Sequence, residues 1–119
     1  MSIVGLHHVS LLISSEECLN FYKVLGFSES YRKQRANDCI VLLDGYGFQL
    51  EVFIDLRHPQ KAEGEQEPLG TRHFALRVDN IEDTVEQLGF DHTEIGTDWT
   101  GVKYCYLHDP DGNQVELHG

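Results

Sequence analysis

The stretch DPDGNQVELH, residues 109–118, has a near copy earlier in the chain, DGYGFQLEVF at residues 44–53. Both copies follow the pattern D-x-x-G-x-Q-L/V-E, and the second begins 65 residues after the first. In each copy a turn-forming Asp and Gly precede a run of alternating apolar and polar residues, which is the period of a half-buried β-strand. The chain is therefore predicted to consist of two related halves that end in matching strands.

The same shift also aligns positions at the start and in the middle of the two halves. The sequence LGF at 25–27 recurs at 88–90 with a shift of 63, which indicates a two-residue difference in length between the halves. The other aligned pairs are Gly5 with Gly70, His8 with His73, Leu11 with Leu76, Glu17 with Glu82, and Leu42 with Leu107.

Each half has the same predicted order of elements, strand, helix and three strands. A helix begins after the serines at 14–15 and ends at Gly26, and a second runs from Asp79 or Asn80 to Gly89, because capping residues and glycines bound both apolar patterns. The predicted strands cover residues 5–13, 27–32, 39–43 and 48–54 in the first half, and 71–78, 92–96, 102–108 and 113–118 in the second.

The fold class is therefore predicted to be α+β, with two βαβββ modules in a single domain of residues 1–119. Module one covers about residues 1–55, a linker about 55–70, and module two about 70–119. The linker is polar and holds two of the three prolines, as is typical of a loop. Its length allows the second module to lie beside the first or to cross to another chain.

The composition excludes several classes of protein. A net charge of −11 argues against binding to nucleic acid or to anionic membrane surfaces, because both depend on basic residues that neutralise phosphates. No apolar run approaches the length needed to span a membrane, and the start of the chain lacks the features of a signal peptide. Three cysteines without a CxxC motif suggest reduced thiols, so we expect a cytoplasmic protein with a small-molecule substrate.

Strand alternation places two histidines and two glutamates on the faces that do not cover the helices. His8 precedes Glu51 by 43 residues, and His73 precedes Glu116 by the same 43. One interpretation is a solvated face, as in any sheet with one wet side. The other is a divalent metal site, because imidazole and carboxylate are ligands for Zn²⁺, Ni²⁺, Mn²⁺, Fe²⁺ or Co²⁺, and a two-fold relation between the modules would bring the four side chains together. The repeated spacing favours the metal site.

The remaining aromatic and histidine residues are less informative. Tyr104 and Tyr106 alternate with Cys105, and the pattern does not decide which set lines a cavity and which packs under a helix. His7 points to the face opposite His8 and receives no role, and His118 is at most a neighbour of the site. Arg77 shares the face of His73 and is the first choice for a cation beside a substrate.

Several segments together resemble the vicinal oxygen chelate superfamily, and in particular its glyoxalase I-like members. These segments are GLHHVSLLI, LGF, QLEVF, GTRHFALRVDNIED and DPDGNQVELHG, which span nearly the whole chain. The resemblance implies the glyoxalase/bleomycin-resistance fold, in which paired modules form a curved mixed sheet around a metal. It also implies that His8, Glu51, His73 and Glu116 are the metal ligands.

The function implied by this resemblance is that of a metal-dependent lyase or isomerase similar to lactoylglutathione lyase. Such an enzyme acts on a hemithioacetal or related vicinal-oxygen compound through a metal-stabilised enediolate. Glu116 would be the catalytic base, with Glu51 as a possible partner. Glu51 favours this reaction, because thiol transferases and dioxygenases of the superfamily do not use that position as a ligand.

The alternatives are another metalloenzyme of the superfamily, such as a thiol transferase or dioxygenase, and a small-molecule-binding protein without catalysis. In the smaller members one module commonly pairs with the complementary module of a second chain. The resemblance therefore implies a homodimer in which His8 and Glu51 come from one subunit, and His73 and Glu116 from the other.

Overall fold

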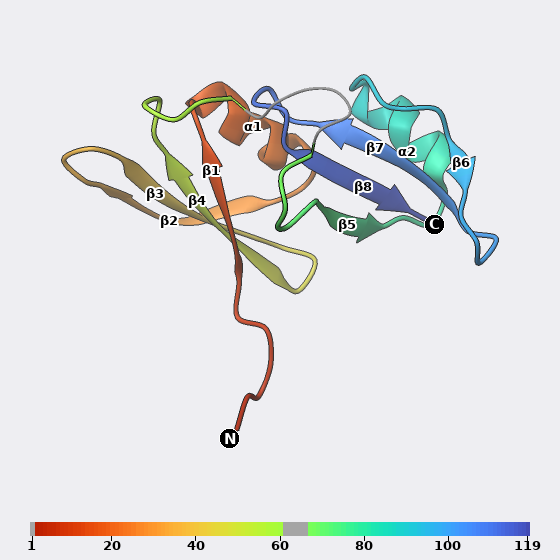
Figure 1. Ribbon diagram of the computed structural model, residues 1–119, viewed down its shortest axis with the longest axis horizontal. Helices are drawn as coiled ribbons and strands as arrows, with labels where there is room; N and C mark the ends of the chain where they lie inside the picture. The colour runs from red at the N-terminus through yellow and green to blue at the C-terminus, as the bar shows by residue number, and fades with distance from the viewer. Residues whose placement is uncertain (1, 61–66) are drawn as a thin grey trace. The chain divides into compact units, whose positions relative to one another are not determined.

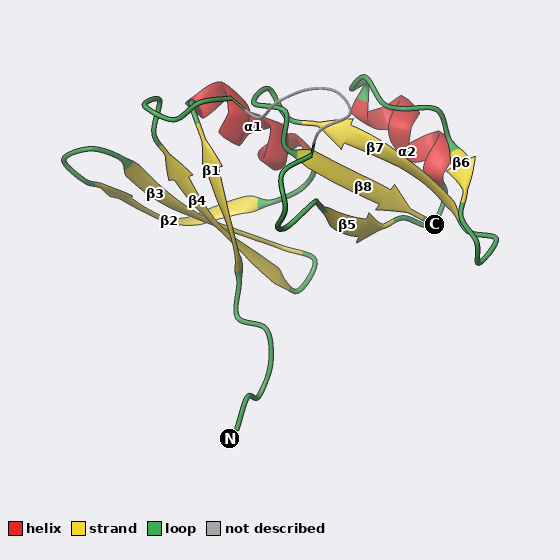
Figure 2. Cartoon of the chain, viewed as in Figure 1, coloured by secondary structure: helices red, strands yellow, loops and turns green. Residues whose placement is uncertain are grey.

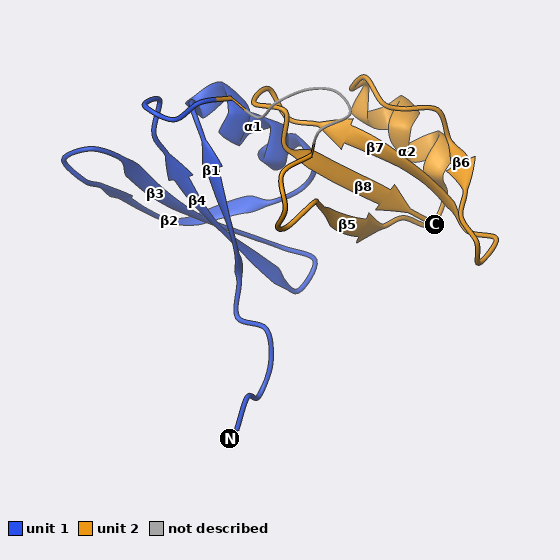
Figure 3. Ribbon diagram, in the orientation of Figure 1, with its two compact units in different colours: residues 1–59 blue, residues 60–119 orange. Residues whose placement is uncertain are grey.

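The computed structural model describes residues 2–60 and 67–119, so part of the predicted linker lies outside the described residues. The chain divides into two compact units, residues 1–59 and 60–119 (Figure 3). Among the residues described, each unit contains one four-stranded sheet and one helix, so the α+β prediction is confirmed (Figure 2). Neither helix of the described residues is long and apolar enough to cross a membrane.

The first unit has the predicted order of elements (Figure 1). Its sheet has the strand order β1-β4-β3-β2, in which β1 runs parallel to β4 and the other neighbours are antiparallel. The elements are β1 (Val9–Ile13), α1 (Glu16–Val24), β2 (Ser28–Gln34), β3 (Cys39–Gly45) and β4 (Phe48–Ile54).

The second unit repeats this topology with the strand order β5-β8-β7-β6, and β5 is parallel to β8 (Figure 1). The prediction of two βαβββ modules is therefore confirmed. The elements are β5 (Phe74–Arg77), α2 (Ile81–Leu88), β6 (Gly96–Thr97), β7 (Lys103–His108) and β8 (Gln114–His118).

Local capping signals determine where both helices start. The Ser15 side chain accepts a hydrogen bond from the Cys18 amide, and the Asn80 side chain accepts one from the Asp83 amide. These bonds satisfy amide groups that have no partner within the first turn of a helix. Helix α2 ends at Gly89 with φ +70°, a left-handed conformation that glycine adopts without steric cost.

The cores form where one face of each sheet packs against its helix. In the first unit the alternate residues of β3 and β4 are completely buried, and in the second the same is true of β7 and β8. Burial of each such side chain contributes about 1.5–3 kcal/mol. The core includes Val41, Leu43, Leu50 and Val52 in the first unit, and Cys105, Leu107, Val115 and Leu117 in the second.

One predicted strand is mostly absent. Residues 92–95 are not a strand, and β6 contains only Gly96 and Thr97, which pair with Tyr104 and Lys103. The reason is that the Thr93 hydroxyl accepts the hydrogen bond of the Tyr106 amide, at 2.8 Å. A side chain therefore replaces the backbone carbonyl that a ladder partner would supply.

The first strand is also shorter than predicted, because it begins at Val9 rather than at residue 5. Its ladder starts where Val9 pairs with Leu50 of β4, and in this register residues 5 and 6 fall beside the turn at Tyr46 and Gly47 rather than beside β4. His8 therefore lies at the junction between an extended N-terminal segment and β1.

Candidate metal centre

The first predicted ligand pair comes together within the first unit. Ser10 and Glu51 are neighbours in the parallel β1–β4 ladder, and the Ser10 hydroxyl donates a hydrogen bond to the Glu51 carbonyl at 3.1 Å. His8, two residues before Ser10, lies on the same face. Its Nε2 atom is 3.6 Å from Oε1 of Glu51, and both side chains are about one third exposed.

His7 contributes a contact that the sequence pattern missed. Its Nδ1 atom lies 2.8 Å from Nδ1 of His8, and the two rings meet edge to face. A hydrogen bond to one imidazole nitrogen fixes the ring and directs the other nitrogen toward a ligand. His7 therefore orients Nε2 of His8 toward Glu51, and the paired histidines in the sequence were the available signal.

The second pair has the same arrangement within the second unit. Ala75 and Glu116 are neighbours in the parallel β5–β8 ladder, which matches the relation of Ser10 to Glu51 in the first unit. Nε2 of His73 lies 3.2 Å from Oε1 of Glu116, and both side chains are largely buried. The repeat at 65 residues therefore extends to the relative placement of a histidine and a glutamate.

Tyr106 distinguishes the second pair from the first. It stands opposite Glu116 in the antiparallel β7–β8 ladder, whereas Leu42 stands opposite Glu51. Its ring lies 5.2 Å from the ring of His73. Burial, and then the charge of Glu116, raise the pKa of Tyr106, so its hydroxyl stays protonated and remains a hydrogen-bond donor.

The structure also resolves the ambiguity between the tyrosines and Cys105. Cys105 is completely buried in the core, so Tyr104 and Tyr106 lie on the opposite face with Glu116. Their rings are 5.8 Å apart, and together they form an aromatic wall beside the His73–Glu116 pair. Half-buried tyrosines of this kind supply both apolar surface and a polar group.

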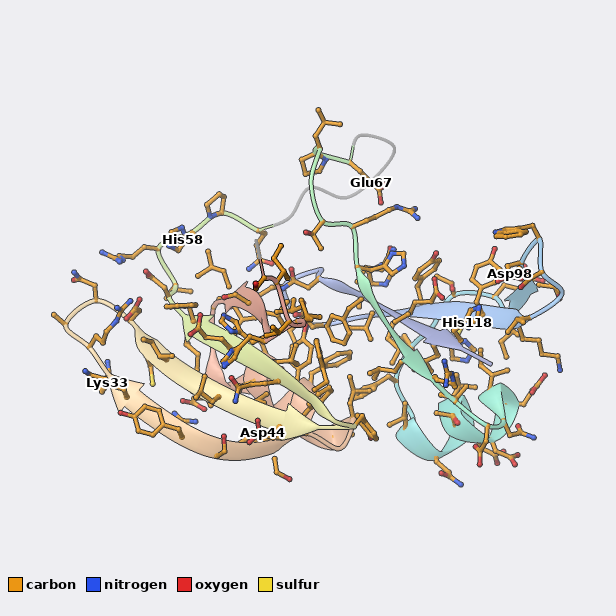
Figure 4. All side chains as sticks on the ribbon, turned by 90° about the horizontal axis from the view of Figure 1, so that it is seen from below. Lys33, Asp44, His58, Glu67, Asp98 and His118 are labelled. Atoms are coloured by element: carbon orange, nitrogen blue, oxygen red, sulfur yellow. The ribbon has the colours of Figure 1, made fainter. Side chains whose placement is uncertain are left out.

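His118 lies farther along the face that carries Glu116. Its Nε2 atom is 3.0 Å from Oδ2 of Asp98, a residue that the sequence pattern did not single out (Figure 4). Hydrogen bonds from Thr100 and His118 hold the pKa of Asp98 well below its usual range. Arg77 pairs with His118 in the β5–β8 ladder, which places it on the predicted face.

The donor set fits a divalent metal ion. Each pair supplies one imidazole and one carboxylate, and Nδ1 of His73 is buried without a hydrogen-bond partner among the described residues. A buried nitrogen of this kind normally has a protein, water or metal partner. Each pair has two side chains of ligand type, and the described residues contain no group of three or more His, Cys, Asp or Glu side chains gathered for a metal.

Comparison with known proteins gives the family of the chain. The Escherichia coli (strain K12) protein "Uncharacterized protein YaeR" is 28% identical over 127 residues, covering 99% of this chain and 98% of that protein. The crystal structure of the glyoxalase family protein from Enterococcus faecalis is 31% identical, with full coverage of both chains and a TM-score of 0.88.

A more distant structure shares the fold. Lactoylglutathione lyase from Agrobacterium tumefaciens is 19% identical, with a TM-score of 0.69, and the match covers 99% of this chain and 95% of the lyase. The family model of the Glyoxalase/Bleomycin resistance protein/Dioxygenase superfamily matches residues 5–117. This match spans both units, and the chain belongs to the Glyoxalase/Bleomycin resistance protein/Dioxygenase superfamily.

Proposed function

We propose that this protein is a metal-dependent lyase or isomerase that acts on a hemithioacetal or a related small molecule with vicinal oxygens. The observation that supports the proposal is the repeated His–Glu pair, His8 with Glu51 and His73 with Glu116, on equivalent strands of the two units. Members of this superfamily are often enzymes, act on small molecules and commonly bind divalent metals. The particular reaction is our inference.

In this proposal His8, Glu51, His73 and Glu116 hold one Zn²⁺, Ni²⁺, Mn²⁺, Fe²⁺ or Co²⁺ ion. Neutral imidazole and carboxylate suit all five ions, so the ligand types do not select one of them. When bound, the ion supplies Lewis-acid stabilisation of negative charge on the substrate oxygens. The histidines bind only when their ring nitrogens are unprotonated, and metal affinity therefore falls in acid.

Glu116 is the proposed base. It takes the proton from the carbon that carries the hydroxyl and sulfur and returns it to the neighbouring carbonyl carbon. The hydroxyl proton passes to the former carbonyl oxygen, so the product is a hydroxy thioester and no outside reductant or oxidant is needed. Its side chain is 15% exposed, against 29% for Glu51. Glu116 also lies opposite the hydroxyl-bearing Tyr106, whereas Glu51 lies opposite Leu42, and Glu51 is therefore proposed as ligand and secondary partner.

We further propose a homodimer in which the two ligand pairs of each site come from different chains. Superfamily members usually form dimers. Each unit by itself supplies only two ligands, which is fewer than the three or four that hold a catalytic metal ion in most proteins.

The test combines elemental analysis with an activity assay. Purified protein is analysed for bound metal, and then assayed with methylglyoxal and several thiols after loading with each of the five ions. We expect metal binding and isomerase activity in the native protein, and the Glu116→Ala variant to lose both. Absence of metal under every loading condition would contradict the proposal. Metal binding with ligand affinity but no turnover would instead identify a binding protein.

A further inference from the structure

Arg35 is held rigidly at the turn between β2 and β3. Its Nε and Nη2 atoms each donate a hydrogen bond of 2.6 Å to the two carboxylate oxygens of Asp38. Its amide donates to the Asp38 carbonyl, and the Gln34 side chain bridges the carbonyls of Arg35 and Asp38. The guanidinium is therefore fixed in place before any ligand binds, which reduces the entropic cost of recognition.

The guanidinium lies on the face of the first sheet that carries the candidate ligands. Its Cζ atom is 5.6 Å from the ring centre of Phe53, within the range of a cation–π contact. Phe53 is two residues after Glu51 on β4, so both side chains point to the same face and lie about 7 Å apart along the strand. Hydrogen bonds to Asp38, and more weakly the charge of Glu51, raise the pKa of Arg35.

One part of the guanidinium is available to a ligand. Nη1 of Arg35 makes no hydrogen bond with any residue that the structure describes, and the side chain is 46% exposed. Lys33 is on the same face, because it pairs with Ile40, the neighbour of Phe53 in the β3–β4 ladder. Lys33 also forms no ion pair within the described segments, and it lies near the same hairpin (Figure 4).

Ion pairs balance the arginine charges at this end of the first sheet. Arg35 is neutralised by Asp38, and the nearby Arg57 by Asp55, whose carboxylate lies 2.6 Å from Nη2 of Arg57. Nε2 of His58 is 3.3 Å from the same carboxylate. Lys33 has no ion-pair partner among the described residues, and the Glu51 carboxylate lies on the same face of a chain whose net charge is −11. A local positive charge on an acidic protein concentrates anions at one place.

We propose that Arg35, with Phe53 beneath it and Lys33 beside it, binds an anionic group of the substrate, a carboxylate or phosphate, on the sheet face that carries Glu51. The inference rests on the proposed function, because it assigns the anion to the molecule whose oxygens meet the metal centre. It defines the substrate as elongated, with the reacting atoms at one end and an anionic group at the other.

A binding experiment tests Arg35 independently of turnover. The full chain is titrated with methyl phosphate and with glutarate at low salt while NMR spectra record the Arg35 Nε–H and Ile40 methyl signals. Both probes supply the shared anion chemistry, and their relative affinities distinguish phosphate from carboxylate. We expect binding to weaken about tenfold in Arg35→Gln and less in Arg35→Lys, which keeps the charge but not the planar fork.

Lys103→Gln is the matched control, because it removes one positive charge from the helix-covered face of the second unit. Lys103 pairs there with Glu82 at 2.5 Å. Anion binding in this variant should stay within about twofold of the native chain, since Lys103 is exposed, paired with Glu82 and screened by salt. Failure of both probes to bind the native chain, or equal binding by Arg35→Gln, would overturn the inference.

A turnover experiment separates this inference from the proposed function. Hemithioacetals of methylglyoxal with 3-mercaptopropionate, which carries a carboxylate, and with 2-mercaptoethanol, which is neutral, are compared. Arg35→Gln should lower kcat/KM for the anionic compound and spare the neutral one. Turnover that is unchanged, or is lost equally for both compounds, contradicts the role of Arg35. The role is equally contradicted if Arg77→Gln alone removes the preference.

If neither compound reacts but anion binding still depends on Arg35, the proposed function fails and the anion site stands. If both compounds react and Arg35→Gln has no selective effect, the proposed function stands and the anion site fails. The two failures are therefore distinguishable.

Discussion

Nε2 of His73 lies 3.2 Å from Oε1 of Glu116, and the ladder that brings them together is repeated in the first unit by His8 and Glu51. With two proposed ligands in each unit, a complete site needs both kinds of unit. This relationship leads to a prediction that distinguishes a site shared between chains from one formed within a chain.

Two double variants, His8→Ala/Glu51→Ala and His73→Ala/Glu116→Ala, each lack one His–Glu pair. Each variant alone should be inactive. When ligand pairs combine across a homodimer, a mixed dimer contains one site with all four ligands intact. An equal mixture of the two variants, refolded together, should therefore recover about a quarter of the native metal content and activity. No recovery is possible when both pairs of a site belong to the same chain.

Metal content per chain and activity are measured on the refolded mixture, with each variant refolded alone as the control. A different affinity tag on each variant allows mixed dimers to be isolated and shows that they form. Recovery that is absent despite dimer formation would exclude sharing of ligands between chains.

Tyr106→Phe should reduce activity more than it reduces metal binding. The substitution keeps the ring beside His73 and removes only the hydroxyl near Glu116. Loss of a protonated hydrogen-bond donor next to a catalytic carboxylate is expected to lower kcat by about tenfold to a hundredfold. The measurements are kcat and the metal dissociation constant of each variant.

Tyr104→Phe is the control, since Tyr104 lies next along β7 and pairs with His118 rather than Glu116. An equal loss of kcat in both variants would show that the aromatic wall, and not the Tyr106 hydroxyl, supports the reaction. A large loss of metal from Tyr106→Phe would show that the hydroxyl stabilises the ligand set.

Asp109→Ala should destabilise the fold, whereas Asp44→Ala, at the equivalent position of the first unit, should have little effect. Asp109 is buried, and its carboxylate accepts hydrogen bonds from the Asp111 and Asn113 amides and the Asn113 side chain at 2.8–2.9 Å. Its removal leaves buried donors unsatisfied, at a cost of about 2–4 kcal/mol.

Asp44 is exposed and accepts a hydrogen bond from the Gln49 side chain, so its loss should cost less than about 0.5 kcal/mol. Urea unfolding followed by circular dichroism compares the two variants with the native chain. Similar midpoints for both variants would show that the Asp109 turn does not support the start of β8.

The stability of the first unit should depend on pH through Glu29. Hydrogen bonds from Arg32, and then from Lys23, lower the pKa of Glu29 from 4.5 to about 2. A carboxyl whose pKa is lower in the folded chain stabilises it above the unfolded pKa, so this contribution is complete above pH 4.5 and is lost as the pH falls toward 2.

Glu29→Gln should therefore lower stability at pH 7 and have little effect near pH 2. The expected difference is at most about 1 kcal/mol, because the ion pair is partly exposed and screened. Thermal unfolding between pH 2 and 7 measures it. Glu17→Gln on α1 is the control, since Glu17 forms no ion pair with another described residue. A change in stability for Glu29→Gln that is the same at every pH would show that the ionised Glu29 carboxylate is not its cause.

The repeat and the alternation of the strands were sufficient to predict the two βαβββ modules, the start of each helix to within one residue, and the shared face of each His–Glu pair. These features are local or periodic, because a strand alternates every two residues and a cap acts within one turn. The prediction failed at residues 92–95, where a threonine side chain takes the place of a backbone partner. Strand propensity does not reveal such a substitution.

Contacts that depend on the fold could not be read from the pattern. Asp98 meets His118 across 20 residues, and Arg35 reaches Phe53 only because the β2–β3 turn folds it over that ring. Alternation alone does not decide whether Tyr106 lines the candidate site or packs under the helix. It defines two faces of the strand without indicating which of them the helix covers. Periodicity is enough to predict which residues share a face of a strand. Which of these residues touch depends on strand register and rotamer, and these are defined only in the folded chain.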